Sequence, residues 1–481
     1  MQKQEADQVK DSSVQSSSAE RKQYLIRIPV LCSCLLVLAG CRPGILMHPE
    51  PEPVPPLQYS RGSVGSSKVG SGESAQWWQS LDDPLLSRYI EEALSANFTL
   101  KEGTARLKQA GLLVAQADAD QYPSVEAGIQ GDADAEDGDL NLSERLGFTF
   151  SWAADLWGRL TAAKQAASRD ALAEQEALAE LSLTLSIEIA ETYYELIEQN
   201  LLLELLRGQI EANTTTRDLV KLRFANGAVA SSDVLQQEEL LASVKAQRPP
   251  IQARLAVLRN RLSVLLGQMP ENKDIALAEA LPELPPLPAL GLPADLLLNR
   301  PDLRKLQQEV AAADYRVAEA AAARLPALKV GGSVGLNSGE AVLSLFSEAL
   351  ATVLDQDRKK NQVERRRAEV EERMAAWSQA YLEAVEEVEN SLSREQEQSR
   401  LLMALQEQLQ VAQSLLEQTR NRYLNGVTEY LPVLSALVSV QNLERSLIRQ
   451  QRVLLSYRLQ LHHALGGSPL LPLSSEPVPL P

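Results

Sequence analysis

Two long stretches without proline constrain the fold of this chain more than any other feature. They cover about residues 157–224 and 357–423 of the 481-residue sequence. Apolar side chains recur there at every third or fourth position, for example at Val370, Met374 and Trp377, which predicts helices packed along their length. At ~1.5 Å per residue each helix would extend roughly 100 Å. The sequence therefore predicts an elongated, mainly α-helical molecule.

The same short motif follows both helical stretches. Asparagine and glycine tolerate the left-handed backbone that ends a helix and reverses the chain, and helical patterns resume near Ser232 and Tyr430. Each half is thus predicted to contain a long antiparallel helical hairpin with a tight tip. The tip residues are Asn226, Gly227 and Ala228 in the first half and Asn425, Gly426 and Val427 in the second.

The matching tips belong to an internal duplication. One offset relates Gly227 to Gly426 and also Gly267 to Gly466, and a slightly larger offset relates Pro123 to Pro326. Such a long repeat indicates two copies of one large unit rather than a solenoid. The predicted organisation is a first repeat at 77–281 (β-hairpin about 122–154, helical hairpin 157–267), a proline-rich linker at 282–293, a second repeat at 294–467 (β-hairpin about 325–346, helical hairpin 357–466) and a proline-rich tail at 468–481.

Each repeat also carries a pair of β-strand patterns. In the first repeat, apolar residues alternate with polar ones from Leu140 to Trp152, which predicts a strand with one apolar face. Its partner covers about 125–131, and the acidic residues between them predict a solvated loop. The second repeat has a shorter, less regular pair at 328–337 and 341–346.

Four such strands leave two alternatives. They cannot close a barrel alone, because about eight strands is the smallest number that does so. In a membrane, their open edges would leave backbone groups unsatisfied in hydrocarbon at several kcal/mol each, so several chains would have to share one barrel. The other alternative is a soluble four-stranded sheet packed on the helices.

Composition excludes several functional classes. The chain has 47 Lys and Arg against 64 Asp and Glu, a formal net charge of −17, which argues against nucleic acid or an anionic membrane surface as the main partner. Its cysteines are Cys32, Cys34 and Cys41, and its histidines are His48, His462 and His463. With so few such side chains, we expect no enzyme activity, no metal site and no cofactor other than a covalent lipid.

The N-terminus has the pattern of a secretory signal. Basic residues precede an apolar run at 28–39, which has the length of a signal-peptide core and is too short to span a bilayer. The string Leu38-Ala39-Gly40-Cys41 resembles a bacterial lipobox. It implies a signal peptide at 1–40 and attachment of diacylglycerol and palmitate to Cys41; the alternative is a cleaved signal with a chance cysteine. Residues 41–76, rich in Pro, Gly and Ser, predict a flexible lipidated tether.

Several motifs occur in an order that resembles the TolC family of outer-membrane factors, in particular the lipidated branch typified by OprM and NodT. The similarity covers nearly all of residues 77–467. The motifs are Trp77-Trp78, Asp83-Pro84, Asn97, Tyr122-Pro123-Ser124, Asp155-Leu156-Trp157-Gly158-Arg159, Leu292-Pro293-Ala294-Asp295 and Arg300-Pro301-Asp302-Leu303.

The resemblance implies a homotrimer. Four strands from each chain would form a twelve-stranded β-barrel in the outer membrane of a Gram-negative bacterium, and the helices would form a hollow periplasmic tunnel. Such a trimer is the passive exit duct of a tripartite efflux system. Its tips bind a periplasmic adaptor (membrane fusion) protein, which links it to an inner-membrane transporter.

Two other classes of protein remain as alternatives. One is a periplasmic coiled-coil adaptor and the other is a structural lipoprotein without a conducting pore. The duplicated hairpins argue against the adaptor, and the alternating segment around Phe148 argues against a purely coiled-coil protein. The exported substrate stays open among drugs, metals, aromatic acids and peptides.

The resemblance also implies a gate at the tips. Asp233 matches a family aspartate that accepts a hydrogen bond from a tyrosine across the paired hairpins, and Tyr423 matches that tyrosine. This bond would hold the closed state within one protomer. The alternatives are that Asp233 caps the N-terminus of a helix and that Tyr423 only packs in the core.

Other gate positions depart from the family pattern. Thr428 stands where the family has an arginine that supplements the bond, and Pro432 and Ser435 stand where it has acidic residues of the narrowest ring. Glu429 is the nearest carboxylate and is the candidate substitute. Opening is expected to be a change in the packing of the tip hairpins that adaptor binding favours.

Overall fold

The computed structural model describes Tyr59 and most of the chain between Gln76 and Gly467. The described ranges are 76–136, 139–271, 275–288, 290, 293–337, 340–350 and 356–467. The predicted signal peptide, lipid site at Cys41, C-terminal tail and all of the tether except Tyr59 and Gln76 lie outside these residues. Among the described helices, none has both the length and the apolar character that a membrane crossing requires.

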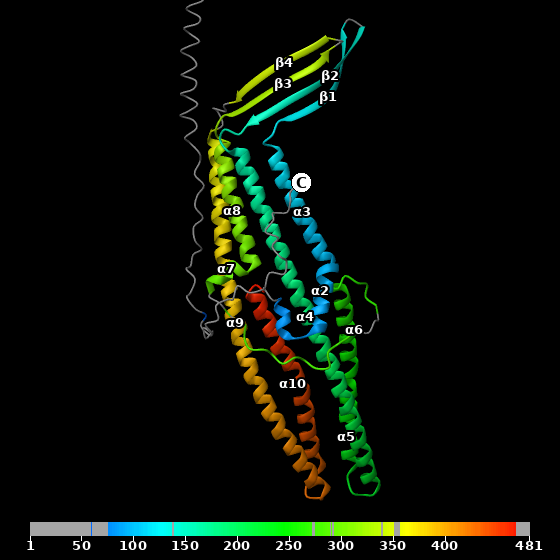
Figure 1. Cartoon of the computed structure of the whole chain (residues 1–481). Helices are drawn as coiled ribbons and strands as arrows, with labels where there is room; N and C mark the ends of the chain where they lie inside the picture. Colours follow the sequence, from blue (N-terminus) through cyan, green and yellow to red (C-terminus); the bar gives the residue numbers. More distant parts are fainter. Residues whose placement is uncertain are drawn as a thin grey trace, which may run out of the picture. The chain divides into compact units, whose positions relative to one another are not determined.

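The two halves contain the same kinds of element in the same order (Figure 1). The first half consists of η1 (Trp77–Leu81), α2 (Pro84–Ala96), α3 (Phe98–Ala119), β1 (Ser124–Glu136), β2 (Asp139–Ala154), α4 (Arg159–Ala225), α5 (Ser231–Ala246) and α6 (Arg248–Leu265). The second half consists of η2 (Pro293–Asp295), α7 (Leu296–Asn299), α8 (Pro301–Ala322), β3 (Ala327–Asn337), β4 (Glu340–Leu350), α9 (Gln356–Leu424) and α10 (Tyr430–Ala464).

The long helices are confirmed. Helix α4 has 67 residues and α9 has 69. The return helices differ, because the first is divided at Gln247 into α5 and α6, whereas α10 continues for 35 residues. Pro249 and Pro250 follow the break and cannot donate backbone hydrogen bonds. Pro432 lies in the first turn of α10, where a missing N–H costs nothing.

The four strands form one antiparallel sheet in the order β1-β2-β3-β4. Its pairing places Phe148 opposite both Ala127 and Val334. Val125, Ile129 and Phe148 are 67%, 82% and 56% exposed, so the apolar face is open. This exposure contradicts the alternative of a soluble sheet packed on helices, and strands β1 and β4 each have one unpaired edge.

Two strand predictions are corrected by the pairing. The acidic stretch expected to be a loop belongs to the ladder, since Asp132 pairs with Ser143 and Asp134 with Asn141. Strand β4 continues to Leu350, four residues beyond the predicted end, because its partner β3 provides backbone groups along that length. Pairing with a neighbouring strand thus overrides the weak β-propensity of aspartate.

The described residues fall into two compact units, and neither unit is one of the predicted repeats. One unit combines Leu112–Asp170 with Val310–Arg373, and it contains the sheet and a small core around Val317 and Val363. The other combines residues up to Gly111 with Ala171–Glu309 and the chain from Met374 onward. Its main core joins residues of both halves, including Trp78, Ile90, Tyr193, Leu262 and Leu459.

The duplication is visible at a joint that occurs once in each half. Gly267 and Gly466 have positive φ, at +71° and +87°. A Cβ on either glycine would lie 2.7 Å from a carbonyl oxygen, that of Ala96 or of Asn299. Side chains at equivalent positions close both joints, because Asn97 donates to the Leu265 carbonyl at 2.8 Å and Arg300 to the Ala464 carbonyl at 3.1 Å.

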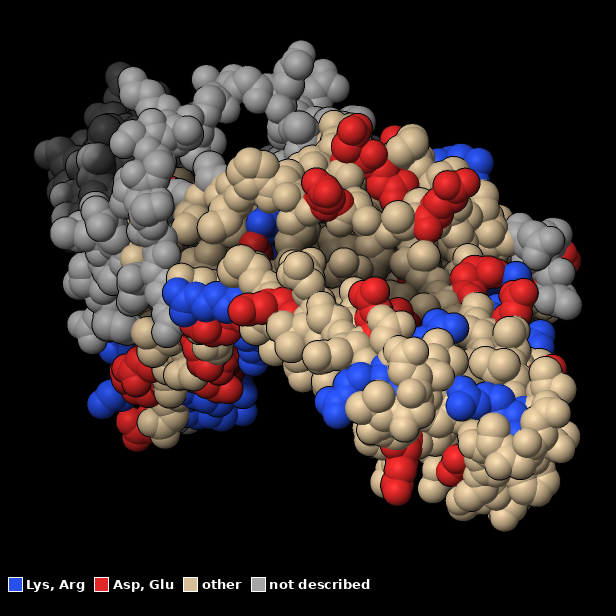
Figure 2. Space-filling model, turned by 90° about the horizontal axis from the view of Figure 1, so that it is seen from below, with Lys and Arg blue, Asp and Glu red and all other residues tan. Residues whose placement is uncertain are grey.

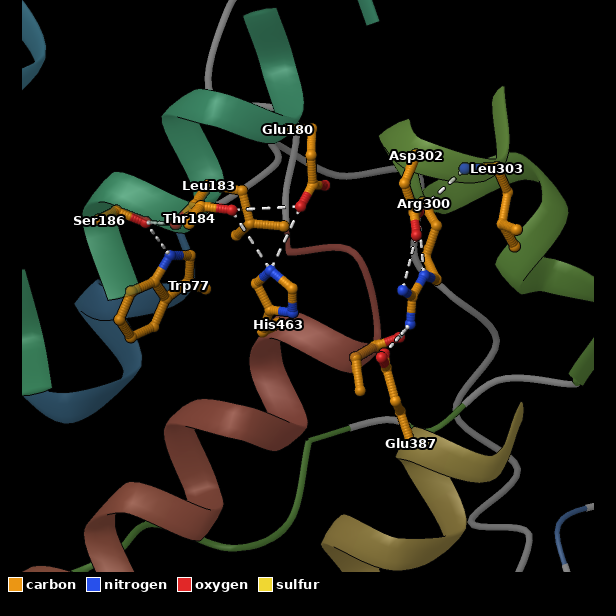
Figure 3. Close-up of polar contacts among 11 residues, drawn as sticks. Trp77, Glu180, Leu183, Thr184, Ser186, Arg300, Asp302, Leu303, Glu387 and His463 are labelled. Atoms are coloured by element: carbon orange, nitrogen blue, oxygen red, sulfur yellow. Dashed lines mark hydrogen bonds and ion pairs between the residues drawn. The ribbon is translucent and has the colours of Figure 1, made fainter. Parts of the chain in front are cut away.

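Arg300 connects three helices in the second joint (Figure 3). Its guanidinium is buried and lies 2.7 Å from both the Asp302 and the Glu387 carboxylates. Burial by itself would raise the pKa of Asp302, but the contact with Arg300 lowers it below the ordinary value. The Arg-Pro-Asp motif therefore has a structural role in fixing α8, α9 and the end of α10.

A second buried arginine fixes the linker between the halves. Arg458 of α10 donates to the carbonyls of Pro285 and Pro286 at 2.7 and 3.1 Å. Its other nitrogens bind the Glu395 carboxylate, and both charged side chains are almost fully buried. The buried charges of Arg458 and Glu395 compensate each other, and the arginine also binds the backbone of the linker.

We predict that Gly466→Ala destabilises the protein far more than Gly426→Ala. Both glycines have positive φ, but nothing lies within 4 Å of a Cβ built at Gly426. The Gly426 variant should lose about 1 kcal/mol from backbone strain, and the Gly466 variant about 3 kcal/mol because of the added clash. The thermal unfolding midpoint in detergent measures both, and equal midpoints would contradict the tight joint.

We also predict an acid-sensitive stability that depends on His462. Burial next to Trp77, with Arg458 nearby, lowers the pKa of His462 to about 4. The unfolded chain then binds more protons than the folded chain between pH 6.5 and 4, so stability is fully present above pH 6.5 and falls by about 3 kcal/mol through this window. His462→Phe should show a smaller loss of unfolding midpoint over the same range; an unchanged loss would contradict this assignment.

Candidate functional site

Both helical hairpins turn at their tips with the same backbone geometry. Gly227 and Gly426 have φ of +70° and +73°. The Ala228 and Val427 N–H groups donate to the Arg223 and Arg422 carbonyls, each at 2.9 Å. These bonds satisfy carbonyls that the ends of α4 and α9 leave free. The two predicted chain reversals are therefore confirmed.

The two tips lie at the same end of the second unit and pack against each other (Figure 1). Their buried apolar side chains are Val220 of α4, Tyr423 of α9, and Tyr430 and Val433 of α10. We call these four residues the tip cluster. The rings of Tyr423 and Tyr430 are 5.2 Å apart, and the Arg223 guanidinium lies 4.6 Å from the centre of the Tyr423 ring. The cation–π contact of Arg223 joins the first tip to the second, whereas the tilted ring pair lies within the second hairpin.

The hydrogen bond expected between Asp233 and Tyr423 is not formed. The Tyr423 hydroxyl is buried and has no hydrogen-bond partner. Burial raises the pKa of Tyr423. The positive charge of Arg223 opposes this rise, and the negative charge of Asp233 adds to it. The helix-cap alternative is also wrong, since Ala230 occupies the N-cap position of α5 and Asp233 lies in the first turn.

A different polar chain connects the tips. The Tyr430 hydroxyl donates to Oε1 of Gln237 on α5, and Nε2 of Gln237 donates to the main-chain and side-chain oxygens of Asn213 on α4 at 3.1 and 3.2 Å. Both amide side chains are fully buried. Burial raises the pKa of Tyr430, as do Tyr423 and Asp233, so its hydroxyl keeps its proton and remains a donor.

The sequence contains one signal for this chain. Gln237 lies on the buried stripe of α5, next to Leu240, Leu241 and Val244. An uncharged polar residue on an apolar stripe indicates a buried hydrogen bond, because an unpaired amide there would be costly. Its partner depends on how two hairpins align and cannot be read from either segment alone.

Polar contacts continue between α4 and α10 away from the tips. Arg445 donates to Gln209, which in turn donates to Glu444 at 2.8 Å. Farther along, Arg452 lies 3.0 Å from Glu198 and 3.5 Å from Glu191. We call this line of contacts the α4–α10 seam. Its contacts involve the charged side chains Arg445, Glu444 and Arg452, and those of Arg452 are ion pairs.

The remaining gate candidates lie at the start of α10. Thr428 is half-buried and Glu429 is exposed at the N-cap position, where its side chain makes no capping bond. Pro432 and Ser435 are exposed as well. Pro432, three residues on, is a neighbour of Glu429 on the helix surface, whereas Ser435, six residues on, lies on a different side.

The outer surface of the tips carries both charged and apolar side chains, and Lys221, Arg422 and Glu429 are among the exposed charged ones. On the face seen from below in Figure 2, acidic and basic side chains are scattered among uncharged ones. Several large apolar side chains near the tips are roughly half exposed or more. These residues, which we call the tip surface, are Leu222, Phe224 and Leu235 from the first hairpin and Leu424, Val427 and Leu431 from the second.

A groove between α4, α9 and α10 has no features of an active site. It has a volume of about 560 Å³ and is lined by polar residues that include Glu188 and Glu387. Both carboxylates form ion pairs, with Arg261 and Arg300 respectively. Within the described residues, no three His, Cys, Asp or Glu side chains gather as a metal site would require.

Comparison with known proteins gives a consistent family assignment. The family profile described as "Outer membrane efflux protein" matches residues 89–268 and 292–467. Nodulation protein T of Rhizobium leguminosarum bv. trifolii is 27% identical over 453 residues, covering 90% of this chain and 95% of that protein. The toluene efflux pump outer membrane protein TtgI of Pseudomonas putida is 25% identical over 462 residues, covering 90% and 96%.

A solved structure has the same fold over most of the chain. The outer-membrane channel OprN aligns with a TM-score of 0.80 at 25% identity, covering 87% of this chain and 98% of that one. The matched length includes helices and strands of both halves. The similarity therefore concerns the whole duplicated architecture.

We predict different stability effects for the two tyrosines of the tip cluster. Tyr430→Phe removes the donor to Gln237 and leaves a buried oxygen unpaired, which should cost about 1–2 kcal/mol. Tyr423→Phe removes a hydroxyl without a partner and should change stability by less than about 0.5 kcal/mol. Unfolding midpoints in detergent measure both effects, and a larger loss for Tyr423→Phe would contradict the observed bonding.

Proposed function

The chain belongs to the outer membrane efflux protein family, and we propose that three copies form the passive exit duct of a tripartite efflux system. Members of this family are outer-membrane efflux channels rather than enzymes. Beyond the family assignment, we propose three things: that the duct is a trimer, that it binds a periplasmic adaptor, and that it opens at the helical tips.

The observation that carries the proposal is the open four-stranded sheet. It has an exposed apolar face and unpaired edges on β1 and β4. In hydrocarbon these edges would leave backbone N–H and C=O groups without partners. Pairing β1 of one copy with β4 of the next removes every open edge, and three copies give the twelve strands that the family resemblance implies, more than the about eight that close a barrel filled by side chains.

The helical part supports a tunnel that opens at its tips. Helices α4 and α9 have 67 and 69 residues, and the tips of the two hairpins pack against each other. The exposed tip surface offers apolar side chains, such as Phe224 and Val427, to a periplasmic adaptor. The adaptor would in turn bind the inner-membrane transporter, which supplies the energy and selects the substrate.

We further propose that the mature chain is anchored by lipid on Cys41. The support is the match of Leu38-Ala39-Gly40-Cys41 to a lipobox and the proline- and glycine-rich tether that follows. Two anchors, the acyl chains and the barrel, would then hold each protomer in the outer membrane.

The experiment places a charge on each face of strand β2. Phe148 and Thr149 are adjacent and exposed, but they point to opposite faces of the sheet. Phe148→Lys should sharply reduce trimer in outer-membrane fractions, because lysine on a lipid-facing position costs about 2–4 kcal/mol. Thr149→Lys, the control, should assemble normally.

Trimer is detected as a band that survives SDS without heating, and the purified trimer is tested for ion conduction in planar bilayers. Equal assembly of both variants would contradict a lipid-facing apolar surface. A monomeric wild type without conductance would contradict the duct itself.

A further inference from the structure

We propose that the hydrogen-bonded chain Tyr430–Gln237–Asn213 is the latch that keeps the tips closed. The proposal rests on the proposed function, since a latch requires a duct that opens. It assigns the gating role to residues other than Asp233 and Tyr423. The chain joins α10 to α5 and α4, and therefore the second helical hairpin to the first.

The geometry uses almost every hydrogen-bonding group of Gln237. Its Nε2 group donates to both oxygens of Asn213, and its Oε1 atom accepts from Tyr430. Asn213 is fixed in turn, because its Nδ2 group donates to the Gln209 carbonyl at 2.8 Å. Both amides are fully buried, so the chain forms only when the two hairpins are in contact. Separation of the hairpins breaks it at the Tyr430–Gln237 bond.

Tyr423 provides an internal contrast. Its ring lies 5.2 Å from that of Tyr430 in the same tip cluster, but its hydroxyl has no partner. Tyr423 therefore contributes packing and the contact with Arg223, while Tyr430 contributes packing and the bond between hairpins. The two roles can be separated by removing one oxygen atom from either residue.

The α4–α10 seam restricts the motion to the tips. The latch is made of uncharged groups, whereas Arg452 forms ion pairs with Glu198 and Glu191 nearer the middle of the helices. Charge-assisted hydrogen bonds are stronger than neutral ones. Adaptor binding can therefore separate the tip ends of the hairpins while the ionic part of the seam stays closed.

The test compares Tyr430→Phe with the matched control Tyr423→Phe in the full-length trimer. Loss of the latch bond should increase the ratio of open to closed states roughly fivefold per protomer. Planar-bilayer recordings should therefore show a higher open probability for Tyr430→Phe and wild-type behaviour for Tyr423→Phe. Should Tyr430→Phe not assemble, Gln237→Met removes the acceptor with little change in volume and is expected to give the same result.

Three outcomes are distinguishable. Wild-type conductance in Tyr430→Phe, with SDS-resistant trimer retained, would overturn the latch and leave the duct standing. Opening by Tyr423→Phe alone would return the gating role to that residue. Absence of any conductance in every variant, including wild type, would mean that the proposed function has failed before the latch is tested.

Discussion

Unpaired backbone groups at the two edges of the sheet are the constraint on which the rest of the structure depends. A sheet of four strands with an exposed apolar face is stable in neither water nor lipid as a single copy. In the proposed trimer, copies of the chain complete one another at these edges. The same symmetric pairing would bring the helices of the copies together, so a closed barrel and a helical tunnel are parts of one proposal.

Polar and apolar contacts have separate roles in the helical part. The main core is apolar and includes Trp78, Tyr193 and Leu262, which favours a permanent arrangement. The contacts that join the hairpins at the tips include uncharged polar ones, between Tyr430, Gln237 and Asn213. Hydrogen bonds of this kind can be exchanged for bonds with water at a small net cost. Uncharged polar contacts suit the tip surfaces that the proposed opening would separate.

Much of the fold could be predicted because its signals are local. Proline-free apolar spacing predicted α4 and α9, and the Asn-Gly pairs predicted both tips. The acidic end of β1 could not be read in this way, since Asp132 and Asp134 are strand residues only through their partners on β2. The break at Gln247 has a local signal in Pro249 and Pro250, but these prolines lie in the return helix and not in the two long helices that dominate the pattern.

The sequence predicts the position of the candidate site but not the hydrogen bonds within it. Both tips were located from the sequence, and they do pack together. The bond between them was assigned to Asp233 and Tyr423 by family resemblance, whereas the structure uses Gln237 and Tyr430. Such a change depends on how the two hairpins align, which the periodicity of either segment does not encode.

The most direct measurement of the central claim is an electron cryo-microscopy structure of the full-length protein purified from outer membranes in detergent. The account predicts three copies, with β1 of each hydrogen-bonded to β4 of the next and Phe148 on the detergent-facing surface. A single copy whose sheet is covered by its own helices, or an assembly in which these two edges remain unpaired, would contradict it.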